Sequence, residues 1–267
     1  EYDIACDTLR VWCSRAAIRQ PYWSARSLRK MRLVEWNCRM ALHRKLFLLR
    51  DLNADLAIVP ECAENLPEQV EDSFSFAWKG HNPKKGLGIL GFNGWGVDVI
   101  DDGPRLPWVL PVRVNHADQH VCDLLAVWTV ASQRAFDSPY GAQVTELIDT
   151  WSEAMTAANT LIAGDFNTSI QGPSSEEHRA NLDRLSELGM ISAYHHAFEI
   201  DHGDEPDRTL RWIGPGRTEY QYMCDFVFVP AEASPCPSRC SAPAGPWRRA
   251  LRQAAAEDVL ADRPASI

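Results

Sequence analysis

The chain lacks the features that mark membrane and secreted proteins. No apolar run approaches the roughly 18 to 20 residues that a membrane-spanning helix needs. Residues 1–30 contain no apolar signal-peptide core followed by a small-residue cleavage site. We therefore expect a soluble, cytoplasmic protein without a transmembrane segment, and we expect it to be a monomer.

Cysteine is too sparse for a disulfide scaffold, at eight residues in a chain of 267. No C-x-x-C pair occurs, and Cys236 and Cys240 have no second pair that would complete a zinc site. Cys38, Cys62 and Cys224 each adjoin a polar residue near the end of a predicted strand. Because adjacent side chains of a strand face opposite sides, we expect these three to be small buried hydrophobic residues behind a site.

Basic charge is also in short supply. The chain has 27 Lys and Arg against 36 Asp and Glu, a net charge of −9, and residues 31–230 alone have 16 against 29, a net of −13. This balance argues against a protein that coats nucleic acid with a generally basic surface. It suits a metal-binding carboxylate site at least as well as a polyanion groove, although local patches decide contact with nucleic acid.

Three zones of the chain differ in composition. Residues 1–30 mix Arg, Cys, Trp and Ser without a sustained period, whereas a regular pattern begins at Met31. From residue 231 onward, Ala, Pro, Arg and Ser make up 24 of the last 37 residues. We therefore place one folded domain at residues 31–230, between a poorly patterned extension and an Ala/Pro/Arg/Ser-rich tail.

Short apolar runs alternate with amphipathic helices in the middle zone. Apolar runs broken by Gly, Pro and Asp predict strands, and apolar stripes at helical spacing predict helices. Many strands, few helices and a βαβ unit at each end of the zone predict an α/β domain of the α+β type with packed sheets. The expected strands are 31–36, 56–60, 74–78, 87–92, 96–100, 108–114, 121–129, 161–163, 209–213 and 226–229, and the expected helices are 39–52, 139–155 and 174–189.

Polar side chains recur at the ends of these strands. Asn37 follows the first strand and Glu61 the second, Asp165 and Asn167 follow residues 161–163, and Asp225 begins the last strand. Strand ends are where rigid backbones hold functional groups. Carboxylate and amide oxygens are hard ligands, suited to Mg²⁺ or Mn²⁺. Each residue alone could equally be a turn former or a helix cap, but their recurrence favours a metal site.

Three blocks resemble a known family in their order along the chain: Trp36-Asn37, Pro60-Glu61 and Gly164-Asp165-Phe166-Asn167. Asp225, within Tyr222-Met223-Cys224-Asp225-Phe226, is similar to the later aspartate of the same pattern. The chain thereby resembles the endonuclease/exonuclease/phosphatase family over about residues 31–230. The resemblance implies two mixed β-sheets packed face to face with helices on the outside, and a divalent-metal-dependent phosphoesterase.

The resemblance also implies roles for the matching residues. Glu61 corresponds to the principal metal ligand, joined by Asp225 and by Asn37, which orients the metal site or the phosphate. Asp165 corresponds to the residue that activates or orients the attacking water, and Asn167 to one that hydrogen-bonds the phosphate. Metal and amide donors stabilise charge on phosphorus, while a carboxylate accepts a proton from water, so the chemistry is consistent.

The remaining polar candidates have competing interpretations. His195 follows a predicted helix and is a candidate for substrate binding, with a solvent-exposed or structural role as the alternative. His202 lies in a polar loop and is expected to be solvated. His81, which lies with Lys84 and Lys85 before Gly86-Leu87-Gly88, could touch a substrate phosphate, although a turn entering a strand is the expected role.

The sequence departs from the family pattern at two positions that bear on whether the chain is catalytically active. The family usually carries His or Tyr in the central strand where this chain has Trp128, and a Ser-Asp-His block, whose His contacts the phosphate, is absent after Val229. We expect residues 1–30 and 231–267 to be non-native, through translation that starts upstream and shifts frame downstream. Retranslating the 3′ nucleotides in the other two frames tests this expectation.

The leading functional prediction is a hydrolase that cleaves phosphodiester bonds with Mg²⁺ or Mn²⁺, as a nuclease acting on nucleic acid. A phosphomonoesterase or a phospholipid-type phosphodiesterase of the same family is an alternative. A degenerate, non-catalytic binding member is another, because of the two departures.

Overall fold

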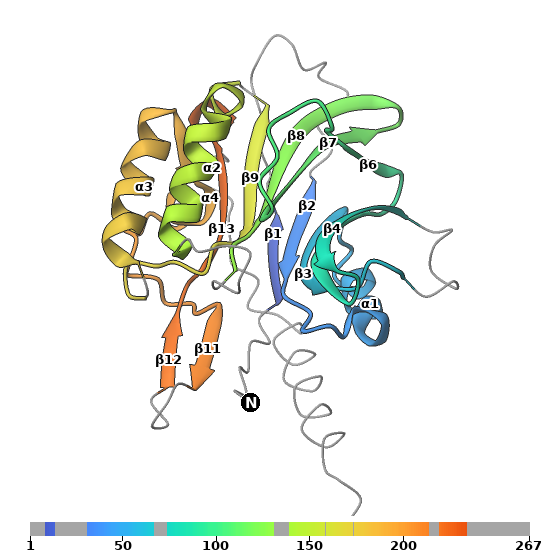
Figure 1. Ribbon diagram of the computed structural model, residues 1–267, viewed down its shortest axis with the longest axis horizontal. Helices are drawn as coiled ribbons and strands as arrows, with labels where there is room; N and C mark the ends of the chain where they lie inside the picture. The colour runs from blue at the N-terminus through green and yellow to red at the C-terminus, as the bar shows by residue number, and fades with distance from the viewer. Residues whose placement is uncertain are drawn as a thin grey trace, which may run out of the picture.

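The computed structural model describes residues 9–13, 31–66, 74–130, 139–157, 159–172, 174–213 and 219–233. Two β-sheets pack face to face in this part of the chain, and helices lie on the outside of the pair (Figure 1). This is the architecture that the family resemblance implies, so the predicted fold class is confirmed. Among the described residues, no helix has both the length and the apolar composition needed to cross a membrane.

The first sheet consists of β1 (Leu9–Cys13), β2 (Arg32–Trp36), β3 (Leu56–Cys62), β4 (Ser75–Asn82) and β5 (Lys85–Gly91). Their order is β1-β2-β3-β5-β4, and only β2 and β3 run parallel. Helix α1 (Leu42–Asp51) makes the crossover between those two strands, as the sequence predicts. Strand β1 comes from the poorly patterned extension and pairs antiparallel along the whole of β2.

The second sheet has the order β10-β13-β9-β8-β7-β6. Its one parallel pair, β8 with β9, is joined through α2, so the second predicted βαβ unit is also present. The bounds are β6 Trp95–Val99, β7 Val109–His116, β8 Gln119–Trp128, α2 Tyr140–Met155, β9 Thr160–Asp165, α3 Ser175–Glu187, β10 Met190–Ser192, α4 Ala193–Phe198 and β13 Asp225–Pro230, followed by a short 3₁₀ turn, Ala231–Ala233.

The expected strand at 209–213 is not a closing strand of either main sheet. It is present as β11 (Leu210–Ile213), but it pairs only with β12 (Glu219–Tyr222) in a separate hairpin that projects from the body in Figure 1. An apolar run indicates extended backbone but does not determine which strand it pairs with. The hairpin therefore lies beside the sandwich rather than within it.

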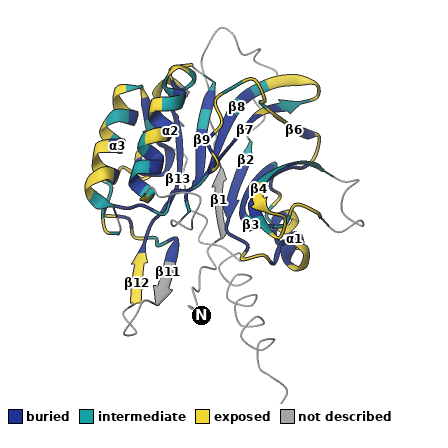
Figure 2. Cartoon of the chain, in the orientation of Figure 1, coloured by how far each residue is buried: buried dark blue, intermediate teal, exposed yellow. Residues whose placement is uncertain are grey.

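Both faces of the central strands are buried, which explains their nearly continuous apolar sequences. In β8, Leu124 and Ala126 belong to the core between the sheets, while Leu125 and Val127 pack under the helices. Figure 2 shows these strands as buried and the outer surfaces of α2 and α3 as exposed. This alternation decides which strand-end side chains face the space between the sheets and which face the helices.

The terminal zones fall mostly outside the described residues. Apart from β1 and Ala231–Ala233, nothing in residues 1–30 or 231–267 is described. The expectation that these zones are non-native therefore stays a prediction.

Candidate active site

Three of the predicted site residues, Asn37, Asp165 and Asp225, meet where the two sheets come together, and Glu61 is near enough for its charge to act on Asp165. Asp165 ends β9 and Asp225 begins β13, and the two are direct partners across that antiparallel pair. Ala163 and Val227 face the core between the sheets, so alternation turns both aspartates toward the same space. Asn37, just after β2 of the other sheet, donates from Nδ2 to Asp165 Oδ2 at 3.4 Å. Residues 128 positions apart are thus joined across the sandwich.

The carboxylates at this point are buried and close enough to influence one another. Asp165 is 4% exposed and Asp225 5%. Burial, followed by the charge of Asp225, raises the pKa of Asp165 well above its usual value, and the Glu61 charge adds to the effect. Hydrogen bonds from Asn37 and from the Asn167 backbone N–H, 3.2 Å from Oδ1, act in the opposite direction. A buried carboxylate cluster of this kind is stabilised by a proton or a cation.

The donor atoms fit a hard divalent cation. Ligand atoms of Asp165, Asp225 and Cys224 lie within 4.8 Å of one another. Carboxylate and amide oxygens suit Mg²⁺ or Mn²⁺, whereas a thiol suits softer metals. The carboxylate oxygens of Asp165 and Asp225 therefore fit the predicted ion, and Glu61 lies near enough for its charge to act on Asp165. The thiol of Cys224 accepts a weak hydrogen bond from Thr209 at 3.6 Å.

Unusual backbone conformations position three residues of the site. Glu61 lies at a bulge where the pairing of β3 with β5 shifts register, and its φ is +59°. Gly164 has φ +140°, and a Cβ there would lie 2.0 Å from the Val127 carbonyl oxygen. Asn167 has φ +50°, a conformation that Asn tolerates better than most residues. Local strain clustered in this way is typical of functional sites.

The loop that carries Asp165 and Asn167 is held by the residue that follows β8. Thr129 donates its N–H to the Asp165 carbonyl at 3.0 Å and its hydroxyl to the Phe166 carbonyl at 2.5 Å. In return, Asn167 Nδ2 donates to the Thr129 carbonyl at 2.9 Å. These bonds fix the two site residues relative to the central strand.

Three residues that the sequence did not place in the metal site lie next to it: Lys85, Trp128 and Tyr140. Lys85 Nζ lies 3.2 Å from Glu61 Oε1 and 5.7 Å from the ring centroid of Trp128. Lys85 follows a turn, as expected, but its side chain also reaches the site. Burial and then the charge of Asp165 raise the pKa of Tyr140, which begins α2 close by. Strand alternation could have found Lys85, because it shares a face with Leu87.

His195 is not brought together with the other predicted residues. Its Nε2 lies 2.9 Å from Glu205 Oε1 and its Nδ1 2.7 Å from Ser192 Oγ. The ring packs near Phe226, which faces the helices, whereas the adjacent Asp225 faces the other sheet. The expectation that His202 is solvated is wrong, because its ring stacks on His195 with centroids 3.5 Å apart.

Cys38, Cys62 and Cys224, the cysteines near the site, are buried, as expected. Burial raises the pKa of the Cys38 thiol to about 11. Its sulfur lies 3.5 Å from the Pro60 carbonyl and 3.4 Å from that of Glu61, behind the bulge. The Cys38 thiol therefore packs the back of the site rather than serving as a nucleophile, whereas the Cys224 sulfur lies beside the two aspartates.

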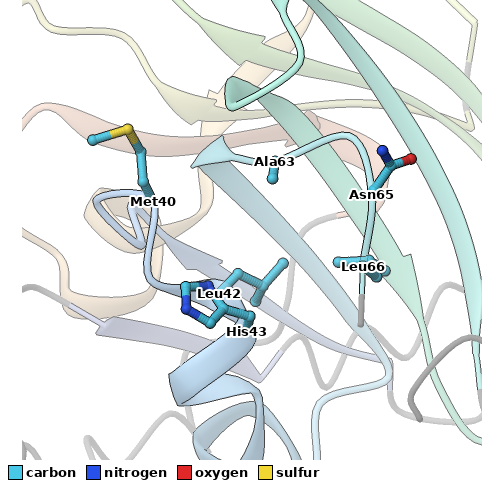
Figure 3. Close-up of a pocket in the computed structure, with 6 residues that line it drawn as sticks. All are labelled: Met40, Leu42, His43, Ala63, Asn65 and Leu66. Atoms are coloured by element: carbon cyan, nitrogen blue, oxygen red, sulfur yellow. The ribbon is translucent and has the colours of Figure 1, made fainter. Parts of the chain in front are cut away.

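A pocket of about 280 Å³ borders the Glu61 segment. The Met40 N–H donates to the Glu61 carbonyl at 2.9 Å, so one residue of the pocket lining contacts the Glu61 backbone. Figure 3 shows the lining residues, which come from the loop before α1, the start of α1 and the segment after β3. They are Met40, Leu42, His43, Ala63, Asn65 and Leu66.

The fold is similar to those of several solved structures, among them an endonuclease, as the sequence resemblance implies. An AP endonuclease from Archaeoglobus fulgidus matches with a TM-score of 0.53 and 14% identity, over 74% of this chain and 86% of that one. D. rerio TDP2 complexed with a single strand DNA product has a TM-score of 0.48, 14% identity and coverage of 76% and 85%. The human Nocturnin catalytic domain matches with a TM-score of 0.47 and 11% identity, over 74% of this chain and 82% of that one.

At these identities the likeness concerns the fold alone. No family profile matches the sequence, and no curated protein sequence matches it.

Proposed function

We propose that this protein is a divalent-metal-dependent phosphodiesterase whose active centre is the carboxylate cluster of Glu61, Asp165 and Asp225. The observation that carries the proposal is the buried Asp165–Asp225 pair, which is hydrogen-bonded to Asn37 of the other sheet. Burying two carboxylates side by side is unfavourable unless a cation or a proton offsets their repulsion. Such a pair destabilises the folded protein, so its presence indicates a functional role.

Each residue has a defined task in the proposed reaction. Glu61 and Asp225 would hold the ion, and Asn37 would join them as a ligand if its oxygen, which accepts from the Arg39 N–H at 3.1 Å, turned toward the ion. A bound Mg²⁺ or Mn²⁺ supplies Lewis acidity to a phosphate oxygen. Asp165 orients the attacking water and accepts its proton. The second N–H of the Asn167 amide donates to a phosphate oxygen, since its first is held by Thr129.

The surroundings of the cluster favour a diester with an extended substituent. The pocket beside Glu61 is lined mainly by apolar side chains and is large enough for one flat substituent attached to the phosphate, such as a nucleobase. Lys85 supplies positive charge next to Glu61. We therefore propose nucleic acid, in single-stranded form, as the first substrate to test, with phospholipid-type diesters and phosphomonoesters as the alternatives.

Charge-neutralising variants test the proposal. We would measure hydrolysis of a generic diester, bis(p-nitrophenyl) phosphate, and of a labelled single-stranded oligonucleotide with Mg²⁺ or Mn²⁺. Glu61→Gln and Asp165→Asn should each lower the rate by at least about 100-fold. Glu64→Gln, an exposed neighbour in the same segment, is the matched control and should retain the wild-type rate. Equal rates in the wild type and both site variants would reject the assignment.

A second candidate function is a non-catalytic binding protein. Two observations favour it: Trp128 stands at the position where the sequence predicts a family His or Tyr, and Lys85 already neutralises Glu61. In this case the oligonucleotide would bind without being cleaved in the presence of either metal. Binding measured by fluorescence anisotropy beside the cleavage assay separates the two functions.

A further inference from the structure

A second cluster of metal-ligating side chains lies on the helix-covered side of the second sheet. His178 comes from α3, His195 from α4, and His202 and Glu205 from the loop that follows α4. Their common neighbour is Phe226, whose ring centroid lies 5.2 to 6.1 Å from those of the three histidines. Because Phe226 and Asp225 face opposite sides of β13, this cluster is separate from the carboxylate centre.

The donor atoms of the cluster converge. Ligand atoms of His195, His202 and Glu205 all lie within 4.8 Å of one another, and His195 Nε2 is 2.9 Å from Glu205 Oε1. His195 is 6% exposed and Glu205 2%. Two imidazoles and one carboxylate within eleven residues match the ligand types of protein zinc sites.

Three polar atoms of the cluster are buried without a hydrogen-bond partner in the described part of the chain. They are His178 Nε2, His202 Nδ1 and Glu205 Oε2. Buried polar groups are rarely left unsatisfied, because each one forfeits its interactions with water. Glu205 and His202 belong to the converging group and the His178 ring lies 6.0 Å from that of His202, so these atoms point to a ligand bound among them.

Hydrogen bonds around the cluster already orient its members. Ser192 Oγ holds His195 through Nδ1 at 2.7 Å, and Thr168 Oγ1 holds His178 through Nδ1 at 2.9 Å. The Gly203 N–H donates to Glu205 Oε1 at 2.9 Å. Contacts of this kind fix the ring orientation of metal-binding histidines and leave the other nitrogen for the ion.

We propose that His195, His202 and Glu205 bind a structural Zn²⁺ ion, with His178 Nε2 as the available fourth donor. The ion replaces the proton shared between His195 and Glu205, so binding releases that proton to solvent. It would tie α3 and α4 to the loop of residues 199–209. Thr209 at the end of this loop accepts hydrogen bonds from the N–H groups of Cys224, at 2.7 Å, and Asp225, at 3.2 Å.

The proposal is independent of the catalytic function and is tested on the full chain. The protein is stripped with EDTA and titrated with Zn²⁺ against a chromophoric chelator, and Co²⁺ is added separately to follow its visible absorption. Asp165→Asn serves as the background, so that zinc in the carboxylate centre is recognised. We expect one equivalent of zinc to remain in that background and Co²⁺ to give the intense bands of a tetrahedral, nitrogen-containing site.

His202→Gln and Glu205→Gln should each weaken zinc binding by more than about 100-fold, since the loss of outer-shell partners alone costs 10- to 100-fold. His196→Gln alters the exposed neighbour of His195 on the same helix and should bind like the wild type. If a ligand variant does not fold, as judged by circular dichroism, the Co²⁺ spectrum of the wild type decides. Zinc uptake that vanishes with Asp165→Asn, unchanged affinity in both folded ligand variants, or a weak octahedral Co²⁺ spectrum would each overturn the proposal.

Discussion

Gly164 precedes Asp165 at a point where β9 closely approaches β8, so Gly164→Ala tests the geometry of the carboxylate centre. A Cβ at this position would lie 2.0 Å from the Val127 carbonyl oxygen, in the backbone of the adjacent strand. The φ of +140° is also one that side-chain-bearing residues rarely adopt. The substitution therefore combines about 1–3 kcal/mol of backbone strain with about 1–3 kcal/mol of overpacking.

The chain offers a control that separates these two costs. Gly189 has φ +76°, and a Cβ there would meet no heavy atom within 4 Å. Gly189→Ala should therefore cost only the strain, about 1 kcal/mol. In thermal unfolding this corresponds to a fall in Tm of roughly 2–4 °C, against roughly 5 °C or more for Gly164→Ala.

The activity readout distinguishes the two positions further. Because Gly164 precedes Asp165, relief of the clash displaces that carboxylate from Asn37 and Asp225. We expect phosphodiester hydrolysis by folded Gly164→Ala to fall at least about tenfold, while Gly189→Ala keeps the wild-type rate. A Gly164→Ala protein no less stable than Gly189→Ala would refute the close approach of the two strands.

Three further predictions concern the core, the ion pair and the loop. Burial raises the pKa of Cys122 from 9.0 to about 12. The unfolded chain therefore loses this proton first as pH rises, and stability that is complete below pH 9 declines above it. Urea denaturation should show the wild type losing about 2 kcal/mol more than Cys122→Ala between pH 9 and 10.5, and parallel pH profiles would contradict the burial. Lys85→Met removes the partly exposed cation beside Glu61. Half-saturation by Mg²⁺ should then occur at up to about fivefold lower concentration. Weaker metal binding would mean that Lys85 does not compete with the ion. Asn167→Ala removes the amide that bonds to Thr129 and the proposed phosphate donor, so kcat should fall by about 100-fold or more, and an unchanged kcat would place the phosphate elsewhere.

The carboxylate centre could be predicted because each of its residues follows or begins a strongly apolar strand. Asn37, Glu61, Asp165 and Asp225 lie where such strands end or start, and the strands themselves were recognisable from composition. Their contacts with one another could not be derived in the same way. They depend on sheet order and register, such as the pairing of Asp165 with Asp225, which connects residues 60 positions apart.

The local sequence pattern could not predict which face of the sheet each side chain points toward. Asp225 and Phe226 are adjacent, yet one lies between the sheets and the other lies under the helices. His195 lies on the side of Phe226, so its separation from the carboxylate centre follows from one step of strand alternation. The bulge at Glu61 also has no clear sequence signature, because a non-glycine residue takes the positive φ.

Pairing partners were equally hidden for the shorter elements. Strand β1 is held by backbone pairing with β2, which composition does not reveal. The three-residue strand β10 is too short to show a hydrophobic period. The residues of β11 predict a strand, but its place in a hairpin depends on its pairing with β12. Tertiary context decides such segments.

Direct measurement of metal binding tests the carboxylate centre most sharply. Mn²⁺ is titrated into the EDTA-stripped protein, and free Mn²⁺ is followed by its electron paramagnetic resonance signal. Wild-type protein and His202→Gln should both take up Mn²⁺, because oxygen ligands at Glu61, Asp165 and Asp225 suit this ion. The double variant Glu61→Gln/Asp225→Asn should lose that uptake. Equal Mn²⁺ binding by the wild type and the double variant would contradict the proposed metal centre.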